Sequence, residues 1–213
     1  MKNIIFLIKE LWAKKSVTRS FLNLRLKEET LLGEVMDIGG GKSADYLSFM
    51  KRGENVTFVN FDIKTGAIVD FEKDSLPLMS DSCDTVLFLN VLEHIFNHQH
   101  IADEVVRITK PAGQLIGFVP FLMWYHADHK DFFRYTHEAL EIIFKNTGAS
   151  NILIEPVSHG PFIASLQMLS QLLPRLLNIP LFVLSYLLDS LYIKLKPSQV
   201  GRYALGYYFN LTK

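Results

Sequence analysis

Three consecutive glycines, Gly39, Gly40 and Gly41, follow an apolar run, and this junction is the first place where the sequence could do chemistry. Glycine lets the backbone turn tightly and approach a ligand closely, and a helix beginning there would present free N–H groups. Asp62 ends the next apolar run, where a carboxylate can accept both hydroxyls of a ribose. These residues predict a nucleoside-binding site. The spacing Gly39-x-Gly41-x-x-Ala44 also satisfies the loose dinucleotide fingerprint, so the motif alone leaves the cofactor open.

A second group of reactive side chains lies in one short segment further along the chain. His126, His129 and Asp131 are candidates for a general base, because imidazole and carboxylate groups take up protons in catalysis. Arg134 is a candidate for holding an anionic acceptor, and Tyr125 for contacting the acceptor. The segment follows an apolar run, and active-site loops of open α/β sheets emerge at the carboxyl ends of strands.

The same loop has a purely structural interpretation. Asp131 and Arg134 would then pair to fix its shape, while Tyr135-Thr136 would cap the following helix. The sequence leaves both interpretations open for this pair and favours a catalytic role for His126 and His129.

No metal site is predicted. Glu93 and His94 are adjacent, but no further ligands follow at zinc spacing. His98 and His100 lie in a polar stretch typical of a solvated turn. Cys83, the only cysteine, precedes an apolar run and is interpreted as structural rather than nucleophilic.

The stretch from Asp70 to His94 resembles the small-molecule branch of the class I S-adenosylmethionine-dependent methyltransferases. It contains a leucine-proline pair, an Asp-rich turn into an apolar run, and the ending Val91-Leu92-Glu93-His94. The later stretch Arg107-Ile108-Thr109-Lys110-Pro111-Ala112-Gly113 resembles the turn before the fifth strand of that family. These motifs, with the glycine turn, cover roughly residues 33 to 120. Two positions depart from the family pattern, Ser43 and Ala112.

The resemblance implies that S-adenosylmethionine is the cofactor and assigns eight residues to its site: Asp37, Gly39, Gly40, Gly41, Asp62, Asp70, Phe71 and Asn90. Asp37 and the glycines would hold the amino-acid end, and Asp62 the ribose. Asp70 and Phe71 would lie beside the adenine. Asn90 would line the methionine end, near the acceptor.

The loop with His126 and His129 also resembles a subset of this family that is often encoded with polysaccharide or glycolipid functions. The resemblance therefore implies methyl transfer to a small-molecule, sugar or glycolipid acceptor, and we expect the methyl group to go to a hydroxyl. Two alternatives stay open: a non-catalytic adaptor of the same fold, and a nicotinamide-dependent oxidoreductase.

The elements that must position these residues alternate between strand and helix, which is typical of a parallel sheet. We expect a Rossmann-like three-layer α/β/α sandwich, mostly parallel, with a late antiparallel strand and an apolar helical insertion. One domain is expected, comprising a helical segment (1–32), the core (33–157), the insertion (158–198) and a final strand (199–213). Strands are predicted over 34–38, 55–61, 68–70, 85–89, 114–119, 151–157 and 203–211, and helices over 43–50, 101–109 and 137–146.

Two apolar segments raise the question of membrane contact. Residues 1–15 have the spacing of an amphipathic helix, which usually packs on its own domain. Residues 160–174 and 176–188 contain no charge, but Arg175 and two prolines interrupt them, so neither predicts a spanning helix. A buried helical pair is the favoured interpretation of the insertion, and peripheral membrane contact through residues 161–196 is the alternative.

Composition limits the remaining functions. Lysine plus arginine equal aspartate plus glutamate at 22 each, so net charge gives no reason to expect a nucleic-acid partner. A single cysteine excludes an internal disulfide and fits a reducing compartment. We therefore expect a cytoplasmic protein, with the inner face of the membrane as a further location.

Overall fold

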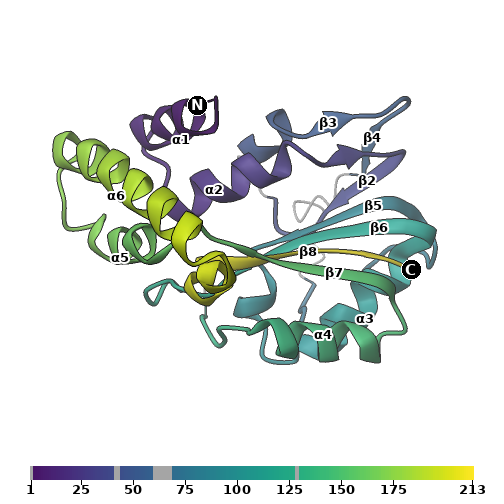
Figure 1. Ribbon diagram of the computed structural model, residues 1–213. Coiled ribbons are helices and arrows are strands. Elements are labelled where there is room, and N and C mark those ends of the chain that lie inside the picture. The colour runs from purple at the N-terminus through teal and green to yellow at the C-terminus, as the bar shows by residue number, and fades with distance from the viewer. Residues whose placement is uncertain (1, 41–43, 60–68, 128–129) are drawn as a thin grey trace.

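The computed structural model describes residues 2–40, 44–59, 69–127 and 130–213 (Figure 1). Within these residues, six strands form the main sheet in the order β4-β2-β5-β6-β8-β7. The strands are β2 (Glu34–Asp37), β4 (Thr57–Val59), β5 (Cys83–Leu89), β6 (Thr109–Pro120), β7 (Ser150–Val157) and β8 (Gly206–Thr212). β4, β2, β5 and β6 pair in parallel, and β8 runs antiparallel to both β6 and β7. The predicted late antiparallel strand is confirmed.

Helices cover both faces of the sheet. Successive side chains of the central strand β5 point to opposite faces, so the strand contributes to two cores. Val86 and Phe88 pack with α3 (His98–Ile108) and α4 (His137–Asn146). Leu87 and Leu89 pack in a second core with α1 (Lys2–Trp12), α2 (Val17–Leu26) and α5 (Pro161–Leu169). Figure 1 shows α3 and α4 on one side of the sheet and α1 and α2 on the other. The three-layer Rossmann-like fold is therefore confirmed.

Side-chain caps fix where several helices begin. Thr136 accepts a hydrogen bond from the backbone N–H of Ala139 at 3.3 Å, which confirms the predicted cap of α4. Ser16 accepts the N–H of Arg19 at 3.1 Å at the start of α2. Such caps satisfy N–H groups that have no partner within the helix.

Several local predictions are wrong. The helix expected over 43–50 is only a 3-10 turn, η1 (Asp45–Ser48), because its first side chain bonds to Lys15 and Arg19 in the preceding helical segment. Val69 and Asp70 lie outside any strand, and residues 60–68, which complete two predicted strands, lie outside the described residues. The expected solvated turn around His98 and His100 is the first turn of α3, where His98 packs against an aromatic ring.

Short elements complete the core. β1 (Thr30–Leu31) and β3 (Lys51–Arg52) form a separate parallel pair. η3 (Leu92–His94) follows β5, and η4 (Pro197–Tyr203) leads into β8. Cys83 is buried at the start of β5 and burial raises the pKa of its thiol, which agrees with its structural interpretation.

The insertion between β7 and β8 forms two helices that differ in burial. α5 buries one face, including Ile163 and Leu166, against the second core. α6 (Arg175–Leu195) continues through Pro180, and Phe182 and Asp189 are its buried residues. The predicted buried pair is therefore correct for α5 and wrong for α6.

α6 is the one described helix that is long and apolar enough to cross a membrane by length and composition, and only 11% of its most apolar window is buried. One such helix is weak evidence for a span. Its exposed leucines are Leu176, Leu177, Leu181, Leu184, Leu187, Leu188, Leu191 and Leu195.

Candidate active site

A cavity of about 570 Å³ opens where β2, β5 and β6 reach their carboxyl ends. This is where open α/β sheets bind their ligands. Its walls come from the glycine turn, the ends of β5 and β6, α2 with the segment before it, η1, and two histidines. The lining residues are Lys15, Ser16, Thr18, Arg19, Leu22, Gly39, Gly40, Ala44, Asp45, Tyr46, Leu89, Asn90, His94, Phe118, Met123 and His126.

The glycine turn has no room for side chains. Gly39 has a φ of +113°, a conformation that other residues rarely adopt, and a Cβ there would overlap Val91. A Cβ on Gly40 would overlap the carboxylate of Asp37. The turn therefore presents backbone to the cavity, as a ligand-binding turn requires. Gly41, also predicted here, lies outside the described residues.

Asp37 ends β2 next to this turn, and one of its carboxylate oxygens has no hydrogen-bond partner. The hydroxyl of Tyr46 donates to Oδ2, while Oδ1 is buried without a hydrogen-bond partner. Burial raises the pKa of Asp37, and the bonds from Tyr46 and the Gly40 backbone, with the charge of Arg19, oppose this rise. A buried acceptor without a donor is costly in a folded protein, so Oδ1 fits a ligand group that donates, such as an ammonium.

Two cations beside the turn were not predicted from the sequence. Lys15 and Arg19 both pair with Asp45, the Arg19 pair at 3.0 Å, and the Arg19 guanidinium lies 4.8 Å from the centre of the Tyr46 ring. Both cations line the cavity, so they can attract the carboxylate of an amino-acid group. No motif surrounds them, and their only signal is their place next to an amphipathic helix.

Asn90 stands at the end of β5 as predicted. Its φ of +54° turns the chain away from the sheet, and its backbone N–H donates to Phe118 at 2.9 Å. Asn90 lines the cavity between the glycine turn and His94. Its role at the methionine end stays a prediction.

The adenine side of the site stays a prediction. Asp70 and Phe71 do not line the cavity. Asp70 accepts the N–H of Glu72 at 3.1 Å and pairs with Lys73, while Phe71 packs against the first core. Asp62, expected to bind the ribose, lies outside the described residues.

His126 is the predicted base that the structure brings into the cavity wall. Its backbone N–H donates to Asp131 at 2.9 Å, and its Nδ1 lies 3.6 Å from the same carboxylate. Burial lowers the pKa of His126, and the charge of Asp131 raises it in part. His126 is therefore neutral near pH 7 and able to accept a proton. His129 lies outside the described residues.

Asp131 and Arg134 hold the loop that carries His126. The Arg134 guanidinium donates to both oxygens of Asp131, at 2.5 and 2.7 Å, and to the Trp124 carbonyl at 3.0 Å. The bonds from Arg134 to the carboxylate hold the pKa of Asp131 at about 2. Because Arg134 uses its donors within the loop and does not line the cavity, the geometry favours the structural interpretation of this pair. Tyr125 is mostly exposed, and its acceptor role stays a prediction.

Glu93 is a buried carboxyl group that the sequence did not place in the site. It is 0% exposed, neither oxygen has a hydrogen-bond partner, and burial raises its pKa to about 8. Its Oε1 lies 3.7 Å from His94 Nε2 and 4.0 Å from His126 Nε2. Its backbone carbonyl accepts the N–H of Phe132 at 2.9 Å and ties the loop to η3.

Glu93, His94 and His126 place ligand atoms within 4.8 Å of one another. Ligands about 2.1 Å from a tetrahedral zinc lie only about 3.4 Å apart, so an ion would require these side chains to move. The predicted absence of a metal stays a prediction, tested below.

Comparisons with known proteins agree with this geometry. A family profile described as "Methyltransferase domain" matches residues 36–117. An "Uncharacterized methyltransferase" of Mycobacterium sp. strain JLS is 29% identical over 100 residues, covering 42% of this chain and 39% of that protein. One of Mycolicibacterium vanbaalenii is 28% identical over 102 residues, with the same coverage. The match thus spans about two fifths of the length of these relatives.

Solved structures show the same fold at low sequence identity. A SAM-dependent methyltransferase from Archaeoglobus fulgidus has a TM-score of 0.53 and 14% identity, covering 92% of this chain and 94% of that chain. Phosphoethanolamine N-methyltransferase 2 of Haemonchus contortus, in complex with S-adenosyl-L-methionine, has a TM-score of 0.51 and 15% identity. The match covers 90% of this chain and 52% of that chain.

The fold and the cavity define a Rossmann-like domain with a ligand site at its strand ends. The family match decides between the cofactors that the glycine motif left open. Residues 36–117 match a methyltransferase domain, and together with the methyltransferase relatives this match supports a class I S-adenosylmethionine-dependent methyltransferase with S-adenosylmethionine as its cofactor.

Proposed function

We propose that this protein methylates a hydroxyl group of a small-molecule acceptor. The observation that carries the proposal is that His126, buried enough to stay neutral, lines the same cavity as Gly39 and Gly40. A hydroxyl must lose its proton as it is methylated, and a neutral imidazole can accept it. When bound, S-adenosylmethionine would supply a methyl group already activated on a sulfonium, whose sulfur would keep the bonding electrons as a neutral thioether.

The residues around the turn fit this cofactor. Asp37 has a free buried acceptor for the amino group, and Arg19 offers a positive charge for the carboxylate. Asn90 would border the methionine end. Asp62, Asp70 and Phe71 are proposed to complete the ribose and adenine side.

On the acceptor side, His126 takes the hydroxyl proton while the hydroxyl oxygen gains the methyl carbon. Asp131 favours the tautomer with the proton on Nδ1, because its carboxylate lies nearest that nitrogen. Nε2 is then the atom that receives the proton. His129 and Tyr125 are proposed to contact the acceptor from the same loop.

We propose a sugar or glycolipid as the acceptor, in polysaccharide or glycolipid synthesis, and the inner face of the cytoplasmic membrane as the place of action. The exposed leucines of α6 support peripheral contact, since apolar helix faces of this size bind lipid interfaces. The balance of 22 basic and 22 acidic residues gives no support to a nucleic-acid acceptor.

The decisive test is calorimetric titration with S-adenosylmethionine and, separately, with NADH. We expect S-adenosylmethionine alone to bind, and Gly40→Ala and Asp62→Ala each to abolish binding. Gly201→Ala, whose Cβ would make only an ordinary contact with Pro156, should leave binding intact. No binding to the folded protein would favour the adaptor interpretation. Binding of NADH alone would favour an oxidoreductase.

A hydroxyl acceptor can be sought by following transfer of a labelled methyl group. His126→Ala should then lower kcat roughly 10²- to 10⁴-fold. His137→Ala, on α4 outside the cavity, is the matched control and should not.

A further inference from the structure

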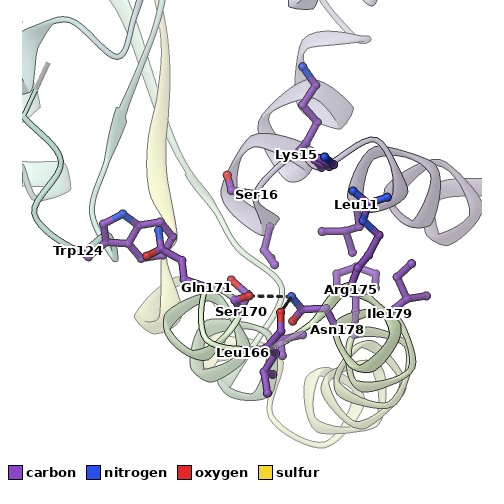
Figure 2. Close-up of a pocket in the computed structure, with 14 residues that line it drawn as sticks. Leu11, Lys15, Ser16, Trp124, Leu166, Ser170, Gln171, Arg175, Asn178 and Ile179 are labelled. Carbon is purple, nitrogen blue, oxygen red and sulfur yellow. Dashed lines mark hydrogen bonds between the residues drawn. The ribbon is translucent and has the colours of Figure 1, made fainter.

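A second cavity, of about 310 Å³, lies between the α1–α2 connection and the α5–α6 hairpin (Figure 2). Lys15 and Ser16 line both this cavity and the candidate active site. Trp124, which lines the second cavity, adjoins Met123, which lines the first. A ligand held in the second cavity therefore has a short path to His126. None of the functions assigned above uses this cavity.

The walls of the second cavity combine positive charge with apolar surface. Lys14, Lys15 and Arg175 line it, and no carboxylate does. Among the described residues, Lys15 pairs with Asp45, whereas no carboxylate lies within ion-pair distance of Lys14 or Arg175. The apolar lining residues are Leu11, Val17, Leu166, Leu173, Ile179 and Phe182. This composition fits a ligand with an anionic group and a hydrocarbon part.

The apolar surface continues from the cavity along α6. Arg175, at the start of the helix, lines the cavity, and the exposed leucines begin at the next residue, Leu176. A hydrocarbon chain leaving the cavity can therefore stay on apolar side chains as it passes into a membrane.

Polar contacts keep α6 on the surface of the domain rather than across a membrane. Asp189 accepts the backbone N–H groups of Phe162 and Ile163 at 3.0 and 2.8 Å and so caps α5. Asn178 donates to the Ser170 carbonyl at 2.7 Å (Figure 2). A spanning α6 would break these bonds and carry the carboxyl group of Asp189 into hydrocarbon, which is costly. A helix lying in the interface keeps them.

We infer that the second cavity binds the phosphate and the first carbons of an anionic lipid, and that this lipid carries the acceptor. The inference rests on the methyl transfer proposed above and specifies its acceptor as lipid-linked. The phosphate lies between Lys14 and Arg175, and the chain follows α6. The head group extends past Lys15 and Ser16 to His126.

The two tryptophans of the chain report on this cavity. Trp124 lines it, and the ring of Trp12 lies 5.9 Å from the guanidinium carbon of Arg175. Tryptophan fluorescence can therefore follow titration with octyl phosphate below its micelle concentration. Octanol tests binding of the hydrocarbon chain alone, and inorganic phosphate tests binding of the phosphate alone. We expect octyl phosphate to bind at least tenfold more tightly than either.

Arg175→Gln should weaken octyl phosphate binding at least tenfold. Lys194→Gln, which removes the same charge from the far end of α6, should leave it unchanged. Inorganic phosphate binding as tightly as octyl phosphate would assign the cavity to free phosphate and overturn the inference. Equal binding by the wild type and Arg175→Gln, with circular dichroism unchanged, would also overturn it.

Calorimetry with S-adenosylmethionine on the same samples separates the two proposals. If the cofactor binds and octyl phosphate does not, the proposed methyl transfer is retained and the proposed lipid site is rejected. Octyl phosphate binding without cofactor binding removes methyl transfer and leaves the lipid site.

Discussion

Oδ2 of Asp131 accepts the backbone N–H of His126 at 2.9 Å and lies 3.6 Å from Nδ1 of the same residue. One carboxylate thus fixes the position of the proposed base and, against the larger effect of burial, raises its pKa. It is itself held by Arg134, so the loop can present His126 to the cavity without help from the acceptor.

Asp131→Asn should lower the pKa of His126. The negative charge of Asp131 stabilises the protonated imidazole, so its removal favours the neutral form. The ring-proton resonance of His126 in an NMR pH titration, assigned with His126→Gln, measures the shift. Asp103→Asn, an exposed acid on α3, is the control. An upward shift would contradict the electrostatic role of Asp131.

Glu93→Gln should change how stability depends on pH. The folded-state pKa of Glu93 is about 8, above its ordinary 4.5, so the folded protein binds the extra proton between these values. Its contribution to the free energy of unfolding therefore falls as pH rises, by about 1.4 kcal/mol per unit. Urea unfolding at about pH 5.5 and 7.5 should show a smaller fall in the variant. Glu54→Gln, an exposed side chain between β3 and β4, should behave as wild type. An unchanged slope in Glu93→Gln would show that Glu93 ionises normally.

Removal of divalent metal should not affect the fold or cofactor binding. Glu93 keeps its proton near neutral pH, and the cluster it forms with His94 and His126 is wider than a zinc site. Thermal unfolding of chelator-treated protein, with and without added Zn²⁺, tests this. A rise in Tm with Zn²⁺ that disappears in His94→Ala would establish a metal site instead.

Arg19→Gln should weaken S-adenosylmethionine binding by about tenfold or more, because charge-assisted bonds are worth roughly 1.5 kcal/mol or more each. Calorimetry measures the change. Arg52→Gln, on the exposed strand β3, removes the same charge away from the cavity and should bind normally. Equal affinities for both variants would remove Arg19 from the cofactor site.

The double variant Leu187→Gln, Leu191→Gln should reduce co-sedimentation with anionic lipid vesicles several-fold, because both side chains lie on the exposed face of α6. Ile142→Gln, which removes an exposed apolar side chain from α4, is the matched control. Equal sedimentation of the double variant and the control would exclude lipid contact through this helix.

The sequence predicted the elements whose signals are local. Both ends of α4 were predicted correctly, since Thr136 caps its start and Gly148, with a φ of +80°, follows its end. The apolar run of β5 also stands where it was expected, because it is buried on both faces.

The sequence predicted a helical segment over 1–32 but not the bounds of α2 within it, because polar residues fill part of the buried face of α2. Thr18, Ser20 and Asn23 are buried there, and Asn23 donates to the buried Glu10 of α1 at 2.6 Å. The periodicity of apolar residues cannot predict an interface that is made by buried polar pairs. The part of the cavity formed by α2, with Arg19, was missed for the same reason.

The candidate site divides in the same way. Gly39, Gly40 and Asn90 follow strands directly, so their motifs place them. Glu93 and His126 are 33 positions apart and meet only because the loop backbone bonds back to η3. Long-range contacts of this kind leave no mark on sequence spacing.

The hydrogen bond between Asp189 of α6 and the start of α5 has a counterpart between α5 and the start of α2. Gln167 of α5 accepts the N–H of Thr18 in α2 at 3.2 Å, so α6 caps α5 and α5 caps α2. Helices at opposite ends of the chain should therefore open together. Hydrogen exchange should show the first amides of α2 and α5 losing protection in the same step, and lipid bound to α6 should slow exchange in α2, beside the glycine turn. Lipid binding at α6 would thus stabilise the start of α2, next to the cofactor site, through two consecutive helix caps.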